Sequence, residues 1–189
     1  MITVGILLAA GHSRRFGGND KLLADFQGQP LACHAAQALI RADVTHLVAV
    51  VSSSTVADVL PGFERTFVED GPREQSDSLK AGISRARDLS ADRALVTLGD
   101  MPLVGAELVD AILARGGTRQ ASATTDGARR MPPACFPKSL FDALLNTQGD
   151  RGAAPILRDL PESQLVQAPA GQLTDIDSLA DLERLQNMR

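Results

Sequence analysis

The stretch from residue 4 to residue 23 constrains this chain more than any other, because an apolar run leads straight into a glycine-rich, cationic loop. The loop and its end hold three glycines and three cations: Gly11, Gly17, Gly18, Arg14, Arg15 and Lys21. Glycines allow backbone N–H groups to close around an anion, and the cations neutralise its charge. A strand that ends in such a loop is where α/β proteins bind phosphates. The sequence therefore predicts an α/β protein with a phosphate site after its first strand.

Two familiar phosphate loops do not fit this stretch. The dinucleotide fingerprint needs G-x-G-x-x-G, whereas five residues separate Gly11 from Gly17. The P-loop needs a lysine between glycine and serine or threonine, whereas Lys21 stands between Asp20 and Leu22. A different phosphate loop is therefore expected here, and a merely solvated surface loop is its structural alternative.

Strand and helix signals alternate through the first 115 residues. Short apolar runs rich in β-branched residues cover 4–9, 46–51, 65–69 and 94–98, and helical stretches cover 30–42, 55–60, 77–88 and 105–115. Such alternation predicts a mostly parallel sheet with helices on both faces, which is a three-layer α/β/α, Rossmann-like architecture.

The rhythm changes after residue 115. Residues 120–125 and 133–136 flank Asp126-Gly127, a hairpin signal, and 164–168 and 172–176 flank a second turn at 169–171. Helices are expected over 139–146 and 153–160, and a last one is expected to start at Ser178. This half predicts a small β-rich insertion and a return to the sheet. No repeat or linker suggests a second domain, so residues 1–189 are expected to form one domain.

Composition excludes several classes of protein. The net charge is −4, and the chain has no Trp, no Tyr and six Phe, so neither a basic surface nor a stacking platform for nucleic acid is expected. The first apolar run ends at Ala10, too early for a signal peptide or membrane span, which predicts a cytoplasmic protein with no membrane contact. Cys33 and Cys135 stand alone and are expected to be free thiols, and the three histidines lack the spacing of a zinc site.

A second motif, LVTLGDMP over residues 95–102, places a carboxylate at the end of a buried strand. Pro102 restricts Met101 to an extended conformation, so the chain turns away there. Carboxyl ends of parallel strands line the ligand crevice, so Asp100 should face the same cleft as the first loop. A carboxylate beside phosphates suits magnesium. The alternative is an Asp that only closes a turn.

A second metal anchor is expected in the stretch LTDIDS, residues 173–178. Alternation along an expected strand places Asp175 and Asp177 on one side and Ile176 on the other. Either Asp could be the second ligand. Asp177 could instead cap the last helix, for which Ser178 and Asp181 also form a plausible capping pair.

The first loop, in residues 4–23, and the LVTLGDMP motif, residues 95–102, together resemble the nucleotidyltransferases that activate molybdenum cofactor and sugars with a nucleoside triphosphate. The resemblance implies that the first loop wraps the triphosphate and that Arg15, Lys21 and Asp100 are the catalytic residues. It implies Mg²⁺ as cofactor, held by Asp100 and by Asp177, which matches the family position best. The family's Thr-Pro-Glu-Asp helix start is only partly kept, because residues 178–181 read SLAD.

The same resemblance assigns the remaining contacts. The implied nucleotide-binding residues are Leu8, Ala9, Ala10, Gly11, Ser13, Arg14, Arg15, Gly17, Lys21, Ser76, Ser78, Leu79 and Asp100. The Ser76-to-Leu79 segment resembles the base pocket of cytidylyltransferases, although its serines could simply cap a helix. Arg151, in a Gly-Asp-Arg-Gly turn at 149–152, is the implied contact of an acceptor phosphate; a polar turn between two helices would look the same.

Within this family the chain is similar to the branch that acts on molybdopterin with CTP. The guanylyl branch has Ala-Gly-Gly where this chain has Ala9-Ala10-Gly11, and a Cβ at Ala10 would narrow the pocket toward a pyrimidine. That one methyl group is worth only ~1–3 kcal/mol of discrimination. The expected partners are CTP and molybdopterin, with a molybdenum-enzyme client left open. The alternatives are a sugar-phosphate or guanylyl nucleotidyltransferase, or a non-catalytic protein that delivers cofactor to a molybdenum hydroxylase.

Overall fold

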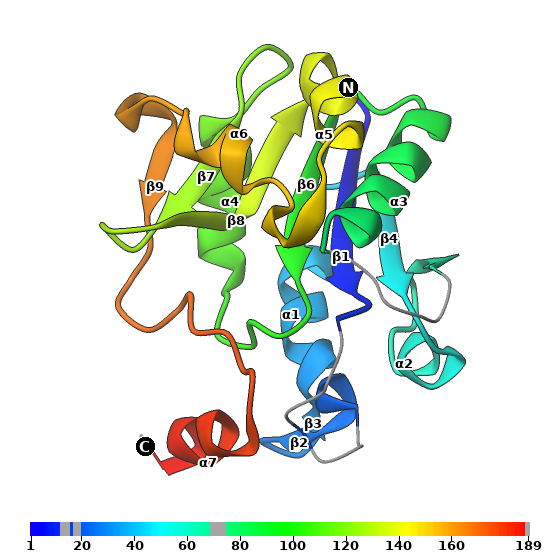
Figure 1. Ribbon diagram of the computed structural model, residues 1–189, viewed down its shortest axis with the longest axis vertical. Coiled ribbons are helices and arrows are strands. Elements are labelled where there is room, and N and C mark those ends of the chain that lie inside the picture. Colours follow the sequence, from blue (N-terminus) through cyan, green and yellow to red (C-terminus); the bar gives the residue numbers. More distant parts are fainter. Residues whose placement is uncertain (12–15, 17–19, 69–74, 188–189) are drawn as a thin grey trace.

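A central seven-stranded sheet organises the computed structural model, which describes residues 1–11, 16, 20–68 and 75–187 (Figure 1). Its spatial order is β5-β4-β1-β6-β8-β7-β9. The strands are β1 (Thr3–Ala9), β4 (His46–Val51), β5 (Glu64–Phe67), β6 (Arg93–Leu98), β7 (Ser122–Thr125), β8 (Arg130–Pro137) and β9 (Leu165–Gln167). A separate small hairpin pairs β2 (Asp25–Phe26) with β3 (Gln29–Pro30).

The strand directions change where the regular alternation of strand and helix signals ends in the sequence. β5, β4, β1 and β6 are parallel neighbours, whereas β8 runs antiparallel to both β6 and β7, and β9 pairs parallel with β7. The register pairs Leu8 with Leu98, and the Gly99 N–H donates to the Leu8 carbonyl at 2.9 Å. Because of this register, the loop after β1 and the Gly99-Asp100 segment leave the sheet at the same edge, here called the carboxyl edge.

Helices cover both faces of the sheet (Figure 1). One face packs against α1 (Leu31–Ile40), α2 (Ser54–Asp58) and α4 (Ala106–Arg115). The other packs against α3 (Gln75–Asp88), α5 (Phe141–Leu145) and α6 (Ala154–Arg158). The last helix, α7 (Leu179–Asn187), lies beyond the carboxyl edge beside the β2–β3 hairpin. Short 3₁₀ helices are η1 (Lys21–Leu23), η2 (Lys138–Leu140), η3 (Gly149–Arg151) and η4 (Glu162–Gln164). The predicted three-layer α/β/α fold is confirmed.

The apolar runs of the central strands are explained by burial on both faces. In β1, Val4 and Ile6 pack into the cluster under α3, α5 and α6, whereas Leu7 and Ala9 pack into the cluster under α1, α2 and α4. Successive side chains of a strand point to opposite faces, so a strand buried on both faces is mainly apolar on both.

The predicted Asp-Gly hairpin joins β7 and β8. Gly127 has a φ of +96°, a conformation that costs a glycine little. The Asp126 carboxylate accepts hydrogen bonds from the backbone N–H groups of Ala128 and Arg129 at 2.9 and 2.7 Å. These bonds, the one from Arg129 first, lower the pKa of Asp126 below its ordinary value.

One predicted strand is wrong. Residues 172–176 form a turn and an irregular segment instead of a strand beside β9. Leu173 is buried in the α1, α2 and α4 cluster, whereas Ile176 is buried with Phe16 and Phe26 in a third cluster beyond the carboxyl edge. The Ile176 N–H donates to the Asp100 carbonyl at 2.9 Å. The chain therefore crosses below the carboxyl edge as a strap toward α7, here called the 171–178 strap.

The cysteine, histidine and acidic side chains of the described residues are the possible ligands of a metal ion. Cys33 and Cys135 are free, as predicted, and burial raises the pKa of the buried Cys135 thiol to about 11. Within the described ranges, no group of three or more His, Cys, Asp or Glu side chains could hold a metal ion. In the same ranges no helix is long and apolar enough to cross a membrane.

Replacing Gly82 by alanine is expected to destabilise the protein by about 1–3 kcal/mol through overpacking. A Cβ at this position of α3 would lie 2.7 Å from Cγ2 of Ile6 and 3.2 Å from Cγ2 of Val50. Both neighbours are buried, β-branched and stiff, so they cannot give way easily. Alanine's better helix propensity, about 1 kcal/mol, offsets only part of this cost.

Urea unfolding measures this difference. Gly117→Ala is the matched control, because its Cβ would have no heavy atom within 4 Å. A Gly82→Ala protein as stable as the control variant would contradict the close packing of α3 on the sheet.

Candidate active site

A buried lysine held by two carboxylates lies at the carboxyl edge. Lys21 opens η1, Asp100 lies two residues after β6, and Asp177 ends the irregular part of the 171–178 strap. The Lys21 Nζ lies 2.7 Å from Asp100 Oδ2 and 3.0 Å from Asp177 Oδ1. The fold therefore brings together three predicted site residues that are far apart in the sequence. Asp100 lies 79 residues after Lys21, and Asp177 lies 156 residues after it.

Local structure fixes the three backbones. The Asp20 carboxylate accepts the Leu22 N–H at 3.0 Å and caps η1, while the Leu22 side chain is buried in the core. The bond from the Ile176 N–H to the Asp100 carbonyl joins the strap to the loop after β6. Asp177, the next residue of the strap, is thereby set beside Asp100.

The electrostatics keep Lys21 charged. Its residue exposure is only 4%, and burial alone would lower the pKa of Lys21. The charges of Asp100 and Asp177, and the hydrogen bonds that they accept, outweigh burial and raise the pKa above its ordinary value. The carboxylate side chains are 23% and 48% exposed, so they lie between the ammonium and solvent.

Asp175 and Asp177, the two candidates for the second metal-binding carboxylate, have different neighbours. Asp177 reaches Lys21, whereas Asp175 is exposed and lines the cavity described below. Capping of α7 is done by the next residue, because the Ser178 Oγ accepts the Asp181 N–H at 3.3 Å and donates to Asp181 Oδ2 at 2.6 Å. The predicted Ser178–Asp181 capping pair is therefore present, and it leaves the Asp177 carboxylate turned toward Lys21.

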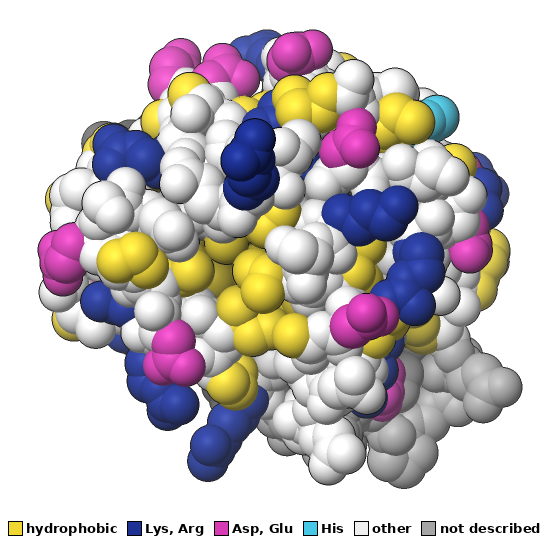
Figure 2. All heavy atoms as spheres, turned by 90° about the horizontal axis from the view of Figure 1, so that it is seen from above, with side chains coloured by type: hydrophobic (Ala, Val, Ile, Leu, Met, Phe, Trp, Pro, Cys, Tyr) yellow, Lys and Arg dark blue, Asp and Glu magenta, His cyan; other side chains and the backbone are white. Residues whose placement is uncertain are grey.

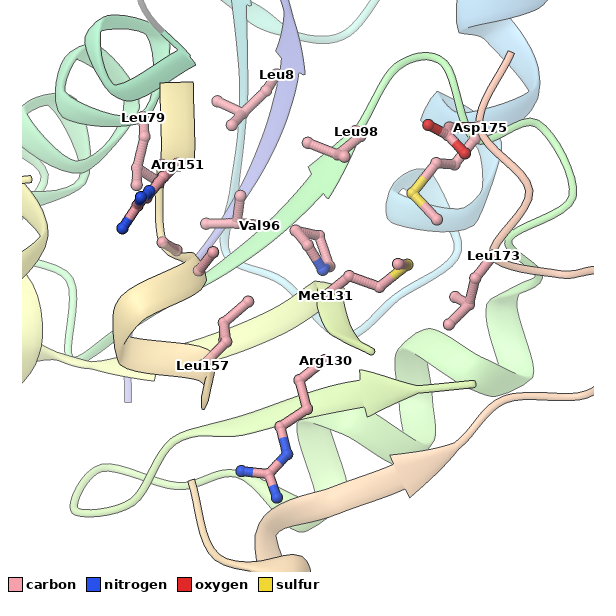
Figure 3. A pocket seen from close by; sticks show the side chains of 15 residues that line it. Leu8, Leu79, Val96, Leu98, Arg130, Met131, Arg151, Leu157, Leu173 and Asp175 are labelled. Atoms are coloured by element: carbon pink, nitrogen blue, oxygen red, sulfur yellow. The ribbon is translucent and has the colours of Figure 1, made fainter. Parts of the chain in front are cut away.

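A cavity of about 190 Å³ lies on the α3 and α6 side of the sheet (Figure 3). Its walls are mainly apolar side chains from β1, β6, β8, α3 and α6, with Arg151 and Asp175 among the polar lining residues. The labelled lining residues are Leu8, Leu79, Val96, Leu98, Arg130, Met131, Arg151, Leu157, Leu173 and Asp175. Arg151 lies beside Leu79 and far from Asp175 in this view, so charged groups stand at two sides of an apolar space.

Other predicted site residues surround this region. Leu8, Leu79 and Arg151 line the cavity. The smaller ones, Ala9, Ala10, Ser76 and Ser78, are buried at the end of β1 and the start of α3. Gly11 is exposed, and a Cβ there would have open space around it. Ser13, Arg14, Arg15 and Gly17 lie outside the described residues.

Sequence reasoning assigned no site role to three residues of β8 and α6 that line the cavity. Met131 and Pro132 come from β8, and Leu157 comes from α6. The Arg130 guanidinium points away from the cavity in Figure 3 and donates to the carbonyls of Arg158 and Leu160, which fastens the end of α6 to β8. These residues carry no motif. The antiparallel pairing of β8 with β6 brings them to the site, and no local pattern announces that pairing.

The face seen from above in Figure 1, where β1 begins, has a different character. Figure 2 shows Lys and Arg interspersed with Asp and Glu around a central group of hydrophobic side chains. A surface that binds nucleic acid usually carries a large patch of positive charge. Among the described residues, this face shows no large patch of one charge sign (Figure 2).

Comparison with known families identifies the fold's lineage. Residues 5–166 match the MobA-like NTP transferase domain. The chain belongs to this family. The predicted relationship and the predicted enzyme class, a nucleotidyltransferase, are thereby confirmed.

Relatives within the MobA-like family differ in their named roles. The purine catabolism protein PucB of Bacillus subtilis is 27% identical over 190 residues, covering 93% of this chain and 91% of PucB. A probable molybdenum cofactor guanylyltransferase of Thermococcus kodakarensis is 38% identical over 112 residues, covering 59% of this chain and 53% of that protein. Among solved structures, Rv0371c of Mycobacterium tuberculosis superposes with a TM-score of 0.83 at 23% identity, covering 100% of both chains. A further structure of Rv0371c is a complex with manganese.

Proposed function

We propose that this protein is a magnesium-dependent cytidylyltransferase that joins CMP from CTP to the phosphate of molybdopterin and releases pyrophosphate. The observation that carries the proposal is the convergence of Lys21, Asp100 and Asp177 at the carboxyl edge. An apolar cavity lined by Leu98, Met101 and Asp175 opens near the same edge. Membership of the MobA-like family supports the reaction type. The names of several relatives support a molybdenum cofactor as acceptor.

The two carboxylates suit a hard divalent cation. Asp100 and Asp177 already converge on one positive charge, and carboxylate oxygens are the ligands that Mg²⁺ prefers. When bound, the ion would neutralise charge on the triphosphate oxygens. The manganese complex of Rv0371c concerns a protein of the same fold and agrees with a divalent ion.

The chain's own residues would then act by positioning and charge. The backbone at Gly11 and the side chains of Arg15 and Lys21 would hold the β- and γ-phosphates. An acceptor phosphate oxygen would attack the α-phosphorus in line: a new P–O bond forms, and the bond to the bridging oxygen breaks, so pyrophosphate leaves with that electron pair. The acceptor is already an anion, so no general base is needed. Arg151, at the cavity, would hold the acceptor phosphate.

Base choice depends on the small residues at the end of β1. Ala10 is buried at the carboxyl end of the strand, and Ser76 and Ser78 are buried at the start of α3. We propose that the Cβ of Ala10 keeps the base site narrow and so favours a pyrimidine. The runner-up is a guanylyltransferase, which is favoured by the names of several relatives.

Ala10→Gly is expected to raise the use of GTP relative to CTP by about tenfold or more, because one methyl group is worth ~1–3 kcal/mol of discrimination. The ratio of kcat/KM values for CTP and GTP, in wild type and variant, measures the change. CTP turnover in the variant reports how much the added glycine loosens the loop. A wild type that prefers CTP, with the same ratio in the variant, would clear Ala10 of this role and keep the function.

A pyrophosphate-release assay tests the function as a whole. Purified protein is given molybdopterin and one of CTP, GTP, UTP or ATP, and then CTP with sugar phosphates in place of molybdopterin. Release that needs both CTP and molybdopterin is the expected result. Preference for GTP would make the protein a guanylyltransferase, release with a sugar phosphate would change the acceptor, and no release with any pair would favour a delivery protein.

A further inference from the structure

Lys21 occupies the place between Asp100 and Asp177 that a divalent ion would take. We propose that Lys21 is a resident counter-cation, which keeps the divalent ion out of this site until a nucleoside triphosphate draws the ammonium onto its phosphates. The inference rests on the proposed function and adds to it an order of binding: the ion enters with the nucleotide and not before it.

The carboxylate pair is held in place without help from Lys21. The Ile176 N–H bonds to the Asp100 carbonyl at 2.9 Å, and the Ile176 side chain is fully buried with Phe16 and Phe26. Asp177 follows Ile176 directly. Since backbone and core contacts set the backbones of Asp100 and Asp177 side by side, we expect their carboxylates to converge on another cation after the ammonium has left.

The Lys21 ammonium can leave without unfolding its own segment. The η1 backbone is fixed by the Asp20 cap and by the buried Leu22 side chain, and neither contact involves the Lys21 side chain. A lysine head group sits on a flexible four-carbon stem, so Nζ can move several ångströms while the backbone stays in place. The exposed sides of the carboxylates give an incoming ion access from solvent.

The ammonium and a divalent ion exclude each other from this site. Both would lie between the same two carboxylates, and two positive charges this close repel each other. The triphosphate offers the ammonium another anionic partner. Nucleotide and ion are therefore coupled, and such couplings are typically about 5–150-fold in affinity.

The test measures binding of Mn²⁺ alone, in the absence of nucleotide, from the electron paramagnetic resonance signal of the free ion. The proteins are wild type, Lys21→Met, Lys21→Met with Asp100→Asn, and Lys138→Met. Lys138 is an exposed lysine at the opposite edge of the sheet, where its N–H bonds to Asp92, so its variant controls for loss of one positive charge.

We expect Lys21→Met to bind one Mn²⁺ about tenfold or more tightly than wild type and the Lys138→Met control. The added Asp100→Asn change should remove this gain, which ties it to the carboxylate pair. Equal Mn²⁺ affinity in wild type and a folded Lys21→Met protein would overturn the proposal.

Wild type offers a second test that does not depend on the folding of the Lys21 variant. If wild type alone binds Mn²⁺ tightly, and Asp100→Asn abolishes that binding, Lys21 does not keep the ion out and the proposal fails. That result would leave the nucleotidyltransferase function standing. Conversely, the expected Mn²⁺ pattern in a protein that releases no pyrophosphate would keep the counter-cation and overturn the proposed function.

Discussion

Asp100→Asn is expected to lower pyrophosphate release by about 10³-fold or more while the fold survives. Asparagine keeps the shape of the side chain but replaces a charged oxygen with an amide nitrogen, which is a poor ligand for a hard cation. Loss of a metal anchor removes several kcal/mol of transition-state stabilisation, and about 4 kcal/mol corresponds to 10³ in rate. Initial rates at saturating and limiting Mg²⁺ measure the effect.

The fold should tolerate this change because the Asp100 side chain is partly exposed and is not part of the hydrophobic core. Circular dichroism and a melting curve check this directly. Asp110→Asn is the control, since Asp110 is an exposed aspartate on α4. Near-normal activity of Asp100→Asn at limiting Mg²⁺ would remove Asp100 from the metal site.

Local pattern was sufficient for the part of the fold built from consecutive elements. β1, β4 and β6 are mainly apolar because both faces are covered, and this gives a strong strand signal. Parallel strands that end at one edge must present their following loops together. The position of Asp100 relative to the first loop could therefore be expected before the structure was known.

Local pattern failed where the chain is held by distant contacts. The alternation of Asp175 and Asp177 with Ile176 is typical of a strand, but residues 172–176 join no sheet in the described part of the chain. Burial of Leu173 in one cluster and Ile176 in another stretches the segment across the carboxyl edge instead. The choice between Asp175 and Asp177 depended on this path, so the sequence could only leave both open.

The sequence predicted which ligands the charged site residues would bind, but not the ion pairs that these residues form with one another. The residue types predicted phosphates beside Lys21 and a metal ion at Asp100 with Asp175 or Asp177, and the family resemblance favoured Asp177. They gave no reason to expect that Lys21 would also form ion pairs with Asp100 and Asp177, at 2.7 and 3.0 Å. A buried ammonium and two neighbouring carboxylates must pair when nothing else is bound, since an unpaired buried charge is costly.

Lys21→Ala is expected to lower kcat by about 10²–10³-fold, the scale seen when one preorganised charge or donor is lost, and to change KM for CTP much less. The reason is that negative charge builds up on the phosphates as pyrophosphate separates, so the ammonium contributes more in the transition state than in the bound substrate. Steady-state kinetics with CTP and saturating molybdopterin measure both constants, and Lys138→Ala serves as the control. A change confined to KM would assign Lys21 to ground-state binding, and unchanged kinetics would remove it from the site. Lys21→Arg separates charge from shape, because it keeps the positive charge in a larger, planar group. Recovery of most of the lost kcat in this variant would show that charge alone is needed. A low kcat would mean that the compact ammonium must fit between the two carboxylates and the phosphates.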